Sequence, residues 1–315
     1  MPFNKIINYG QVLFEKTNMK CLVTGASGLL GHEICKQLKN SNHEVWAIDN
    51  GFRSNAKPSC DVFIEKDLID CLDTLPIDFD VIYHMAAING TDYFYSMPLT
   101  VLTNNLNCDL KLFNWAEKCT KLKNLIYASS SEVVAGSTEN GILEKTTVTI
   151  DNIHNARWSY RLPKIVAENY LSNSNLPWTI IRYYNVYGPL SKSGHFVADQ
   201  IYNQRKGVFE VIGPQETRTF CFVTDAIYAT INLVGKANLQ VVNVGSDQEI
   251  LILDAAKIIS RSLNIVDPDW VLLPSRSGSS LKRSPDISLL KTLLPTYTCR
   301  SFAQGIQETI QSYEY

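Results

Sequence analysis

The segment GASGLLG, residues 25–31, directly follows the short apolar run CLVTG (21–25) and opens a stretch of helical period. A strand, a glycine-rich turn and a helix in this order are typical of a turn that cradles phosphate. Gly25 permits the tight turn, Gly28 lets the backbone approach a pyrophosphate, and Gly31 allows close helix–sheet packing. The helix N-terminus adds free N–H groups and a positive dipole. The spacing is G-x-x-G-x-x-G, so a merely tight turn remains the alternative.

Two acidic residues follow the next predicted strands. Asp49 ends the run EVWAID (44–49), where a carboxylate can accept both ribose hydroxyls and repel a 2′-phosphate. This position favours NAD over NADP. Arg53 nearby could soften that preference, although we expect a solvated loop arginine. Asp67 follows the third predicted strand, where it either reaches the adenine or caps a helix N-terminus.

Outward from the glycine turn, short β-branched runs alternate with longer segments of helical period, which is typical of a parallel sheet with crossover helices. The predicted strands are 21–25, 44–49, 61–66, 80–87, 124–130 and 178–184, with helices near 29–40, 98–119 and 158–173. After Pro189 we predict strands near 208–212 and 240–244, helices near 196–206, 223–235, 251–263 and 301–313, and a polar loop at 275–285. The fold class is therefore α/β: a Rossmann-type doubly wound parallel sheet with a smaller interleaved C-terminal substrate-binding lobe.

The expected domain organisation follows from this pattern. Residues 1–19 form an N-terminal extension, 20–185 form the NAD-binding domain, to which 221–245 returns, and 186–220 and 246–315 form the substrate-binding lobe. The extension mixes charges and amides with apolar residues. It contains no apolar stretch of the length that a signal peptide or a membrane span requires.

Composition narrows the function classes. The 315-residue chain is 45% hydrophobic and 19% charged with net charge −2, which is typical of a globular protein with ample material for a core. No basic run suggests a nucleic-acid partner. Eight scattered cysteines without a C-x-x-C motif indicate reduced thiols. The five histidines include no zinc-type pair. We expect a cytoplasmic protein without a metal or a membrane partner.

The segment RWSYRLPK (157–164) raises a separate question. Tyr160 and Lys164 are four residues apart and share one face of a helix, so they either pack or react together. Pro163 is compatible with a helix only near its start. We therefore expect the helix to begin near Ser159 or Tyr160, which places the phenol where the helix dipole favours phenolate.

Taken together, these motifs resemble those of the extended short-chain dehydrogenases/reductases, in their nucleotide-sugar epimerase, dehydratase and decarboxylase branch. The resemblance covers essentially everything after residue 20, and the motifs stand in the order expected of that family. They are GASGLLG (25–31), Asp49, HMAA (84–87), Asn105 in TNNLN, YASSSEV (127–133), the Tyr160–Lys164 pair, RYYNVYGP (182–189), IGPQETRTFCFVTDAI (212–227) and RSPDIS (283–288).

The resemblance implies a catalytic set. Tyr160 would take the proton of a sugar 4-hydroxyl as hydride leaves C4, and Lys164 would lower the pKa of the phenol and bind the nicotinamide ribose. A serine at the end of the fifth strand would form a hydrogen bond to the same sugar 4-hydroxyl. In the register that we favour, Ser130 is this serine, Ser131 is its neighbour and Glu132 is an additional acid/base.

Two alternatives stay open at this point. Counted back from Gly136, Ser131 becomes the triad member in place of Ser130. For Glu132 the alternative is a salt-bridged loop acid.

The resemblance also implies ligand contacts. Thr91, in the loop INGTDYFYSMP (88–98), would lie near the sugar, while Asn185 and Arg218, with Arg276 as a third group, would hold the diphosphate of a sugar nucleotide. The residues implied for NAD are Gly25, Ser27, Gly28, Leu29, Leu30, Gly31, Asp49, Asn50, Asp67, Leu68, Met85, Ala86, Ala87, Asn105, Tyr160, Lys164 and Tyr183.

The expected function is therefore an NAD-dependent enzyme that modifies a nucleotide-diphosphate sugar through a 4-keto intermediate. Glu132 favours dehydration or decarboxylation over epimerisation. An oxidoreductase acting on such sugars and a non-catalytic NAD-sensing regulator are further alternatives. We also expect a homodimer, because in relatives the helices that correspond to 98–119 and 158–173 pair across a two-fold axis.

Overall fold

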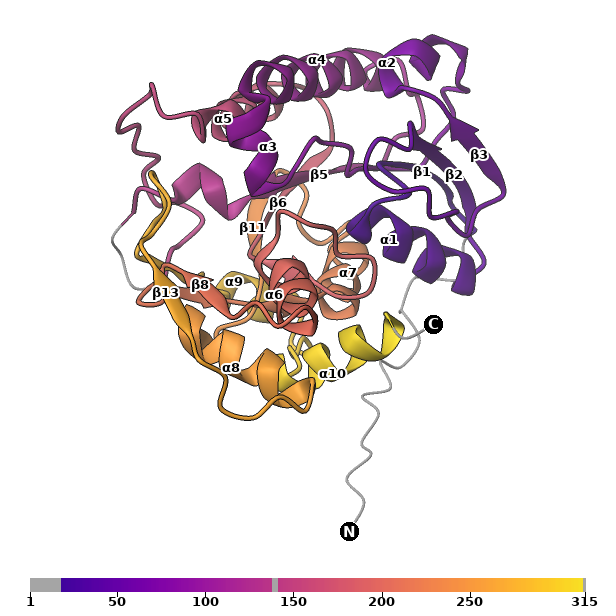
Figure 1. Cartoon of the computed structure of the whole chain (residues 1–315). Coiled ribbons are helices and arrows are strands. Elements are labelled where there is room, and N and C mark those ends of the chain that lie inside the picture. Colours follow the sequence, from indigo (N-terminus) through magenta and orange to yellow (C-terminus); the bar gives the residue numbers. More distant parts are fainter. Residues whose placement is uncertain (1–17, 138–140, 314–315) are drawn as a thin grey trace.

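A seven-stranded parallel sheet forms the centre of the computed structural model, which describes residues 18–137 and 141–313 (Figure 1). Its strand order is β11-β6-β5-β4-β1-β2-β3. The bounds are β1 Lys20–Thr24, β2 Glu44–Asp49, β3 Val62–Glu65, β4 Val81–His84, β5 Asn124–Ser130, β6 Trp178–Tyr183 and β11 Gln240–Val244. Most of the predicted extension 1–19 lies outside the described residues. Its last residue, Met19, is buried against β1, and its N–H donates to His43 Nδ1 at 3.1 Å.

Helices cover both faces of this sheet. One face carries α2 (Leu68–Cys71), α4 (Pro98–Ala116) and α5 (Trp158–Ser172), and the other carries α1 (Leu29–Asn40) and α7 (Val223–Asn232). Alternate residues of each strand point to opposite faces, so the strands serve two cores. In β1, Cys21 and Val23 join the core beneath α1, whereas Leu22 joins the core beneath α4.

The order of the strands reverses direction between β1 and β4. The chain runs outward from β1 through β2 to β3, and then returns to build β4, β5, β6 and β11 on the other side of β1. The crevice beyond the carboxyl ends of β1 and β4 is where open α/β sheets bind their ligands. The fold therefore directs the glycine turn after β1 and the segment after β4 toward one site.

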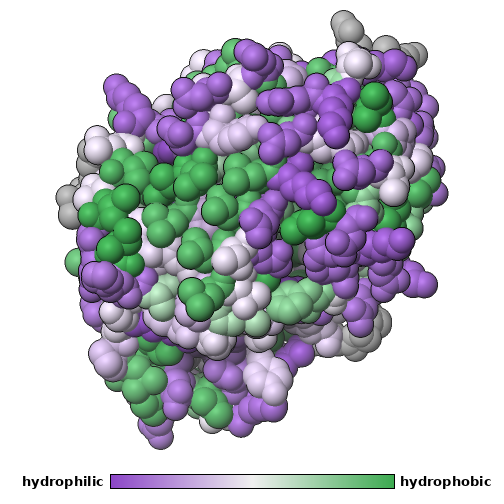
Figure 2. Space-filling model, turned by 90° about the horizontal axis from the view of Figure 1, so that it is seen from above, coloured by the Kyte–Doolittle hydropathy of each residue, from purple (hydrophilic) through white to green (hydrophobic). Residues whose placement is uncertain are grey.

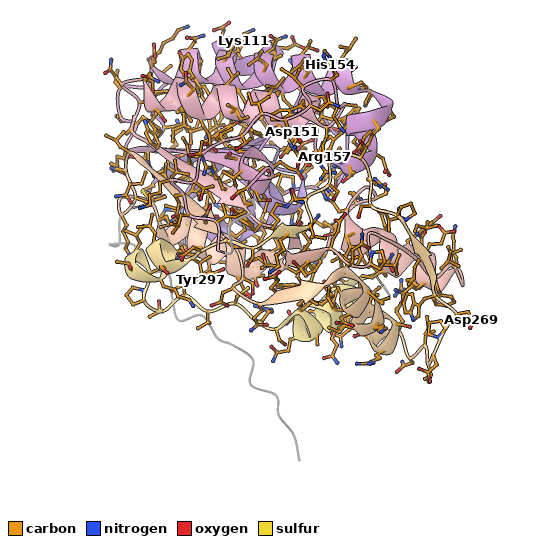
Figure 3. All side chains as sticks on the ribbon, turned by 90° about the vertical axis from the view of Figure 1, so that its left-hand side faces the viewer. Lys111, Asp151, His154, Arg157, Asp269 and Tyr297 are labelled. Atoms are coloured by element: carbon orange, nitrogen blue, oxygen red, sulfur yellow. The ribbon has the colours of Figure 1, made fainter. Side chains whose placement is uncertain are left out.

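A smaller lobe packs beside this edge of the sheet. It contains α6 (Phe196–Arg205), α8 (Ile252–Ser262), α9 (Ser288–Leu293), α10 (Phe302–Ser312) and several strand pairs. The pairs are β7 (Val186–Tyr187) with β10 (Cys221–Phe222), β8 (Glu210–Ile212) with β13 (Val271–Leu273), and β9 (Thr217–Thr219) with β12 (Glu249–Leu251) and β14 (Lys282–Arg283). Asp269 marks the outer tip of this lobe and Lys111 marks the α4 layer above the sheet (Figure 3). Buried residues of α8 and α10 continue the core beneath α1 and α7, so the lobe shares the core of the sheet.

The long elements agree with the sequence predictions, and the differences lie at their ends. The predicted bounds 29–40, 44–49, 124–130 and 240–244 are those of α1, β2, β5 and β11. The predicted strand 80–87 was too long: β4 ends at His84, and residues 85–87 leave the sheet as a loop. The short helices α2, α9 and α3 (Thr91–Ser96) were not predicted.

The start of α5 differs slightly from the prediction. The helix begins at Trp158, so Pro163 lies in the second turn rather than the first. Proline has no N–H, so it cannot make the helical hydrogen bond to the carbonyl of Ser159. Tyr160 is still in the first turn, as expected.

Candidate functional site

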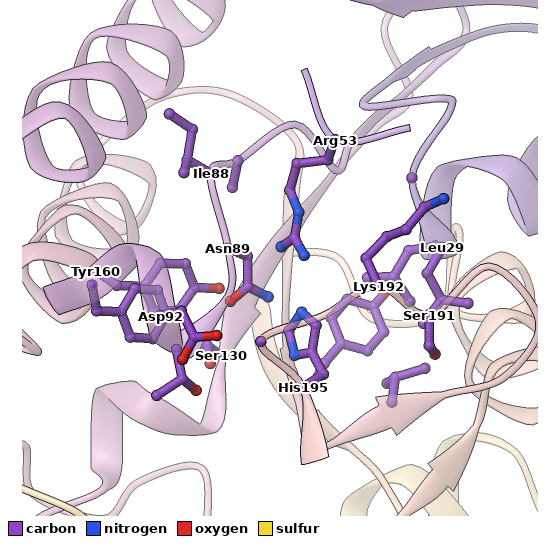
Figure 4. A pocket seen from close by; sticks show the side chains of 18 of the residues that line it. Leu29, Arg53, Ile88, Asn89, Asp92, Ser130, Tyr160, Ser191, Lys192 and His195 are labelled. Atoms are coloured by element: carbon purple, nitrogen blue, oxygen red, sulfur yellow. The ribbon is translucent and has the colours of Figure 1, made fainter. Parts of the chain in front are cut away.

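A cleft of about 1040 Å³ lies between the sheet edge and the smaller lobe (Figure 4). Leu29, Ser191 and Lys192 lie toward one end, and Tyr160 and Ser130 lie toward the other. Of the residues implied by the resemblance, all line this cleft except Ser27 and Asn105. Segments that are far apart in the sequence therefore meet in one cavity.

The glycine turn at one end has no room for side chains. Gly25 adopts φ 66°, a left-handed conformation, and a Cβ there would lie 2.7 Å from Ala86 N. A Cβ on Gly31 would overlap the carbonyl oxygen of Gly25. The turn therefore presents bare backbone and the N-terminus of α1 to the cleft, as a pyrophosphate requires.

Asp49 lies beside this turn at the end of β2. Its Oδ2 accepts from Ser27 N at 3.0 Å and its Oδ1 from Gly51 N at 2.8 Å. These bonds fix the carboxylate at the cleft wall, where its remaining lone pairs can accept from ribose hydroxyls. Asp67 caps α2 by accepting from Ile69 N at 3.1 Å. The helix-cap interpretation of Asp67 is therefore confirmed, and its side chain also lines the cleft.

Ser27 and Asn105 support the wall from behind. Ser27 is buried, and its backbone N–H holds Asp49. Asn105 Oδ1 accepts from Ile88 N at 2.7 Å and its Nδ2 donates to Ile88 O at 3.1 Å. Both ends of this amide are thus used to fix the loop after β4. Asn105 is not among the residues that line the cleft, whereas its neighbour Asn104 is.

Tyr160 and Ser130 form a pair at the other end of the cleft. The Tyr160 ring stacks on Phe94 with centroids 4.8 Å apart and planes inclined by 16°. Ser130 Oγ accepts from Glu132 N at 3.2 Å, which leaves its own hydrogen available, and the hydroxyl acts to lower the pKa of Tyr160. The phenol and the hydroxyl therefore point at one small volume, where a substrate hydroxyl could bind both (Figure 4).

The other two serines of the run are placed differently. Ser129 Oγ donates to Glu168 Oε1 at 2.5 Å, and Glu168 is also bound by Arg182. Ser131 is buried and lines the cleft. Of the three, Ser130 is the one whose hydroxyl acts on the pKa of Tyr160. The choice of Ser130 over Ser131 as the triad serine stays a prediction.

The surroundings of Tyr160 only partly match the expected electrostatics. Burial raises the pKa of Tyr160, while Ser130 and Arg53 act in the opposite direction. Lys164, expected to lower this pKa, instead donates from Nζ to Tyr127 OH at 2.9 Å. Burial lowers the pKa of Lys164 itself. A base at Tyr160 therefore needs further positive charge close to the phenol.

Glu132 is bound by three buried arginines. Arg157 forms a paired contact, Nε to Oε2 at 3.0 Å and Nη2 to Oε1 at 2.6 Å. Arg161 Nε reaches Oε2 at 2.9 Å, and Arg283 Nη1 also donates to Oε1. Burial alone would raise the pKa of Glu132, but Arg157 and Arg283 hold it well below its usual range. The salt-bridged interpretation is therefore the observed one, and an ionised Glu132 cannot donate a proton.

This cluster leaves positive charge facing the cleft. Three guanidinium groups share one carboxylate, and Nε of Arg283 is buried without a hydrogen-bond partner among the described residues. Arg157 and Arg283 both line the cleft. Sequence reasoning missed these arginines, although Arg157 and Arg161 flank Tyr160 at a helical spacing of four.

The three residues expected to hold a diphosphate lie nearer the smaller lobe. Asn185 has φ 40° and donates from Nδ2 to Thr219 O at 2.8 Å. Arg218 is buried and donates from Nη2 to Glu216 Oε2 at 2.5 Å. Arg276 lies at the rim and pairs with Asp92 at 3.0 Å. All line the cleft, and Thr91 joins them there, its N–H donating to Gly194 O at 3.0 Å.

Arg53 and His195 extend across the middle of the cleft (Figure 4). Arg53 is a partly exposed loop arginine, but its position is fixed: Nη2 donates to Ser193 O at 3.0 Å, and its guanidinium lies 5.1 Å from the centre of the Tyr93 ring. Burial lowers the pKa of His195 to about 4, so its imidazole is neutral at pH 7. A loop between two strands gives no periodic signal, which is why the sequence did not place Arg53 here.

Within the described residues, no group of three or more His, Cys, Asp or Glu side chains is arranged to hold a metal ion. In the same part of the chain, no helix has the length and apolarity needed to cross a membrane.

Comparison with known proteins agrees with this geometry. Residues 21–245 match the NAD dependent epimerase/dehydratase family. UDP-N-acetyl-alpha-D-glucosaminuronate decarboxylase of Bacillus cytotoxicus is 28% identical over 93% of this chain and 97% of its own length. UDP-glucuronic acid decarboxylase 1 of Danio rerio is 28% identical over 96% of this chain and 74% of that protein.

A solved structure extends the likeness to the whole fold. UDP-glucuronic acid 4-epimerase of Bacillus cereus, in complex with UDP-glucuronic acid and NAD, is 26% identical with a TM-score of 0.80 and covers 94% of this chain and 99% of that one. NAD is also the cofactor of this chain, and the bare glycine turn and the fixed Asp49 carboxylate fit it. The chain is an enzyme and belongs to the NAD-dependent epimerase/dehydratase family.

Proposed function

We propose that this enzyme decarboxylates a nucleotide-diphosphate uronic acid through a 4-keto intermediate. The proposal rests on the excess of positive charge around Glu132, where three arginines share one carboxylate beside Tyr160 and Ser130. Buried cations are costly unless they are paired. A carboxylate on C5 of the sugar, one carbon from the reacting C4, would supply the missing anion. A neutral hexose would leave the excess without a partner.

The residues of the chain have distinct parts in the first step. Bound NAD supplies the reversible hydride acceptor for C4. Tyr160 takes the proton of the 4-hydroxyl, and Ser130 donates a hydrogen bond to the same oxygen, O4. The sugar ring lies over the start of α3, which begins at Thr91, and Asn185, Arg218 and Arg276 bind the diphosphate. This binding places C4 against the phenol and leaves C5 near the arginines.

Oxidation at C4 makes the uronate a β-keto acid. The C5–C6 bond then breaks, carbon dioxide leaves, and the electron pair forms an enolate whose charge is on O4. The Tyr160 hydroxyl, now protonated, and Ser130 stabilise that oxygen by hydrogen bonds. A proton from water completes C5. Tyr160 would then return its proton to O4 as hydride goes back to C4, which restores the 4-hydroxyl. Glu132 needs no change of protonation in this sequence, which agrees with its depressed pKa.

A panel of sugar nucleotides tests the proposal directly. UDP-glucuronic acid and UDP-N-acetylglucosaminuronic acid are compared with UDP-glucose, UDP-N-acetylglucosamine and their GDP, dTDP and CDP counterparts. Mass spectrometry should detect loss of carbon dioxide from a uronic acid alone, and in deuterium oxide the product should carry one deuterium at C5. Turnover of a neutral hexose with no reaction of any uronic acid would refute the proposal.

Epimerisation of a uronic acid is the second candidate. It is favoured by the likeness to the UDP-glucuronic acid 4-epimerase and by the same arginines, which could hold a carboxylate without releasing it. The panel separates the two reactions, because an epimer keeps its mass and gains no deuterium at C5. Proton NMR of the product identifies inversion at C4.

Cofactor preference gives a prediction at the other end of the cleft. NAD should bind more tightly than NADP, because Asp49 would face the 2′-phosphate and is fixed by Ser27 and Gly51. We expect Asp49→Ala to narrow the difference, mainly by weakening NAD. Calorimetric titration of both cofactors measures this. Equal affinity for NAD and NADP in the unmodified protein would contradict the role of Asp49.

A homodimer is part of the proposal. Leu99, Leu102, Leu106 and Leu110 form one stripe along α4, and Leu99 is 75% exposed. Val166 on the adjacent α5 is 41% exposed. Hydrophobic side chains gather on this face of the molecule (Figure 2). Two copies that pair these helices across a two-fold axis would bury both stripes.

Light scattering tests this assembly. The unmodified chain should have twice the monomer mass at micromolar concentration, and Leu106→Glu should shift the protein toward monomer by placing like charges at the centre of the interface. A monomer mass for the unmodified protein would contradict the dimer.

A cytoplasmic location also remains part of the proposal, since all eight cysteines are free thiols, as in reducing compartments.

A further inference from the structure

A buried chain of polar groups runs behind Lys164, away from the cleft. Lys164 Nζ donates to Tyr127 OH at 2.9 Å, and Tyr127 OH donates to Asp109 Oδ2 at 2.6 Å. The other carboxylate oxygen of Asp109 lies 2.9 Å from His84 Nε2. His84 Nδ1 lies 2.7 Å from Thr24 Oγ1. Each of these side chains is at most 1% exposed.

The directions of these bonds follow from the donors at each end. Ala86 N donates to Thr24 Oγ1 at 3.2 Å, so the hydroxyl hydrogen of Thr24 is free for His84 Nδ1. The proton of the imidazole is then on Nε2 and is donated to Asp109. Burial lowers the pKa of His84, which agrees with a neutral ring. Two series of hydrogen bonds, one from Lys164 through Tyr127 and one from Thr24 through His84, therefore end on the carboxylate of Asp109. We call these series the two arms.

We propose that Tyr127 and Asp109 are positioning residues for Lys164, which keep its ammonium group charged and fix its direction. Tyr127 accepts one of the three N–H groups of the ammonium, so the other two face the cleft where a ribose hydroxyl and O4 would bind. The Tyr127 ring supports the same group from 4.4 Å. The second arm, through His84 and Thr24, fixes the segment 85–87 that lines the cleft.

Charge is the reason that this site needs Asp109. An ammonium group buried without an anion would lose its proton, because desolvation disfavours the charged form. Burial indeed lowers the pKa of Lys164, and Asp109 is the largest opposing influence. The groups that act on Lys164 from α4, α5, β4 and β5 are Asp109, Cys108, Glu168, His84 and Tyr127. Glu168 is itself paired with Arg182, so Asp109 is the anion that matters.

The sign of the expected pH effect follows from this arrangement. In Asp109→Asn the carboxylate charge is absent, so the pKa of Lys164 falls further and the ammonium group loses its proton at a lower pH. The alkaline limb of the kcat profile should then move to lower pH by about one unit or more. Tyr127→Phe keeps the ring but removes the acceptor. Its kcat should fall about tenfold, a part of the effect of the catalytic groups themselves.

The decisive measurement is the titration of Lys164 in protein labelled with carbon-13 at lysine Cε, without substrate. The signal is assigned by its loss in Lys164→Met. Asp109→Asn should lower the pKa of Lys164, whereas Tyr83→Phe should leave it unchanged. Tyr83 is the matched control because its buried hydroxyl, on the adjacent strand, has no hydrogen-bond partner among the described residues. An unchanged Lys164 titration in Asp109→Asn would overturn the inference.

Tyr127→Phe provides a second test in case Asp109→Asn does not fold. If thermal unfolding shows that Asp109→Asn does not fold, Tyr127→Phe takes its place. A lowered kcat together with an altered Lys164 titration supports the inference, and an unchanged titration overturns it. The inference rests on the proposed role of Lys164 in the site. The NMR titration needs no substrate, so its outcome is distinguishable from a failure of the sugar-nucleotide panel.

Discussion

Replacing Tyr160 by Phe is expected to reduce turnover by about 10²- to 10⁴-fold. The change deletes one hydroxyl, which in the proposed mechanism accepts the proton of the 4-hydroxyl. The phenyl ring still stacks on Phe94, so α3 keeps its support. We therefore expect the melting temperature and NAD affinity to stay close to those of the unmodified protein. Steady-state turnover, thermal unfolding and calorimetry measure the three quantities.

Two further variants distinguish loss of the base from general damage. Ser130→Ala removes the second hydrogen bond to O4 but leaves the base, so its turnover should fall less than that of Tyr160→Phe. Lys164→Met should reduce both turnover and NAD affinity, because the proposal places the ammonium group against the ribose as well as O4. If Tyr160→Phe kept most of the original rate on the identified substrate, Tyr160 would have only the packing role that its contact with Phe94 already provides.

The parts of the fold that the sequence predicted are those with a strong period. The strands β2, β5 and β11 are apolar runs bounded by polar residues, and α1 begins at a glycine turn, so their bounds follow from the pattern. The strands of the smaller lobe contain only two or three residues each, which is too short for any period. The end of β4 was also not predictable, because the apolar residues 85–87 continue the pattern of the strand while their role is to line the cleft.

The candidate site divides in a similar way. Glycine turns, Asp49 and the Tyr160–Lys164 pair are local features, and the structure brings all of them to one cleft. The charge state of Glu132 depends on Arg283, which is distant in the sequence and reaches it through the smaller lobe. From the sequence alone, Glu132 was interpreted as an acid/base group. Its role as the ionised partner of three arginines is visible only in the structure.

The second large effect is expected for Glu132→Gln. The substitution removes the one carboxylate that Arg157, Arg161 and Arg283 share, and it leaves buried cations without an anion. Removing one partner of a buried ion pair typically costs about 3–5 kcal/mol of folding free energy. We expect a loss of this order in urea unfolding at pH 7. Adding Arg161→Met should recover part of it, because this change removes one cation and Arg161 does not line the cleft.

The pH dependence of unfolding gives an independent reading of the same group. Three arginines hold the folded-state pKa of Glu132 well below the usual range of a glutamate. The contribution of Glu132 to the free energy of unfolding is therefore complete at pH values above that usual range, and it is lost as the pH falls toward the folded-state pKa. The unmodified protein should therefore lose stability steeply below about pH 5, and Glu132→Gln should lose less over the same interval because it has no carboxylate to protonate. Equal urea midpoints for the two proteins at pH 7 would mean that Glu132 does not neutralise the arginines. In that case the charge argument for a uronic acid substrate would fail with it, since the positive excess around Glu132 is what calls for a second carboxylate.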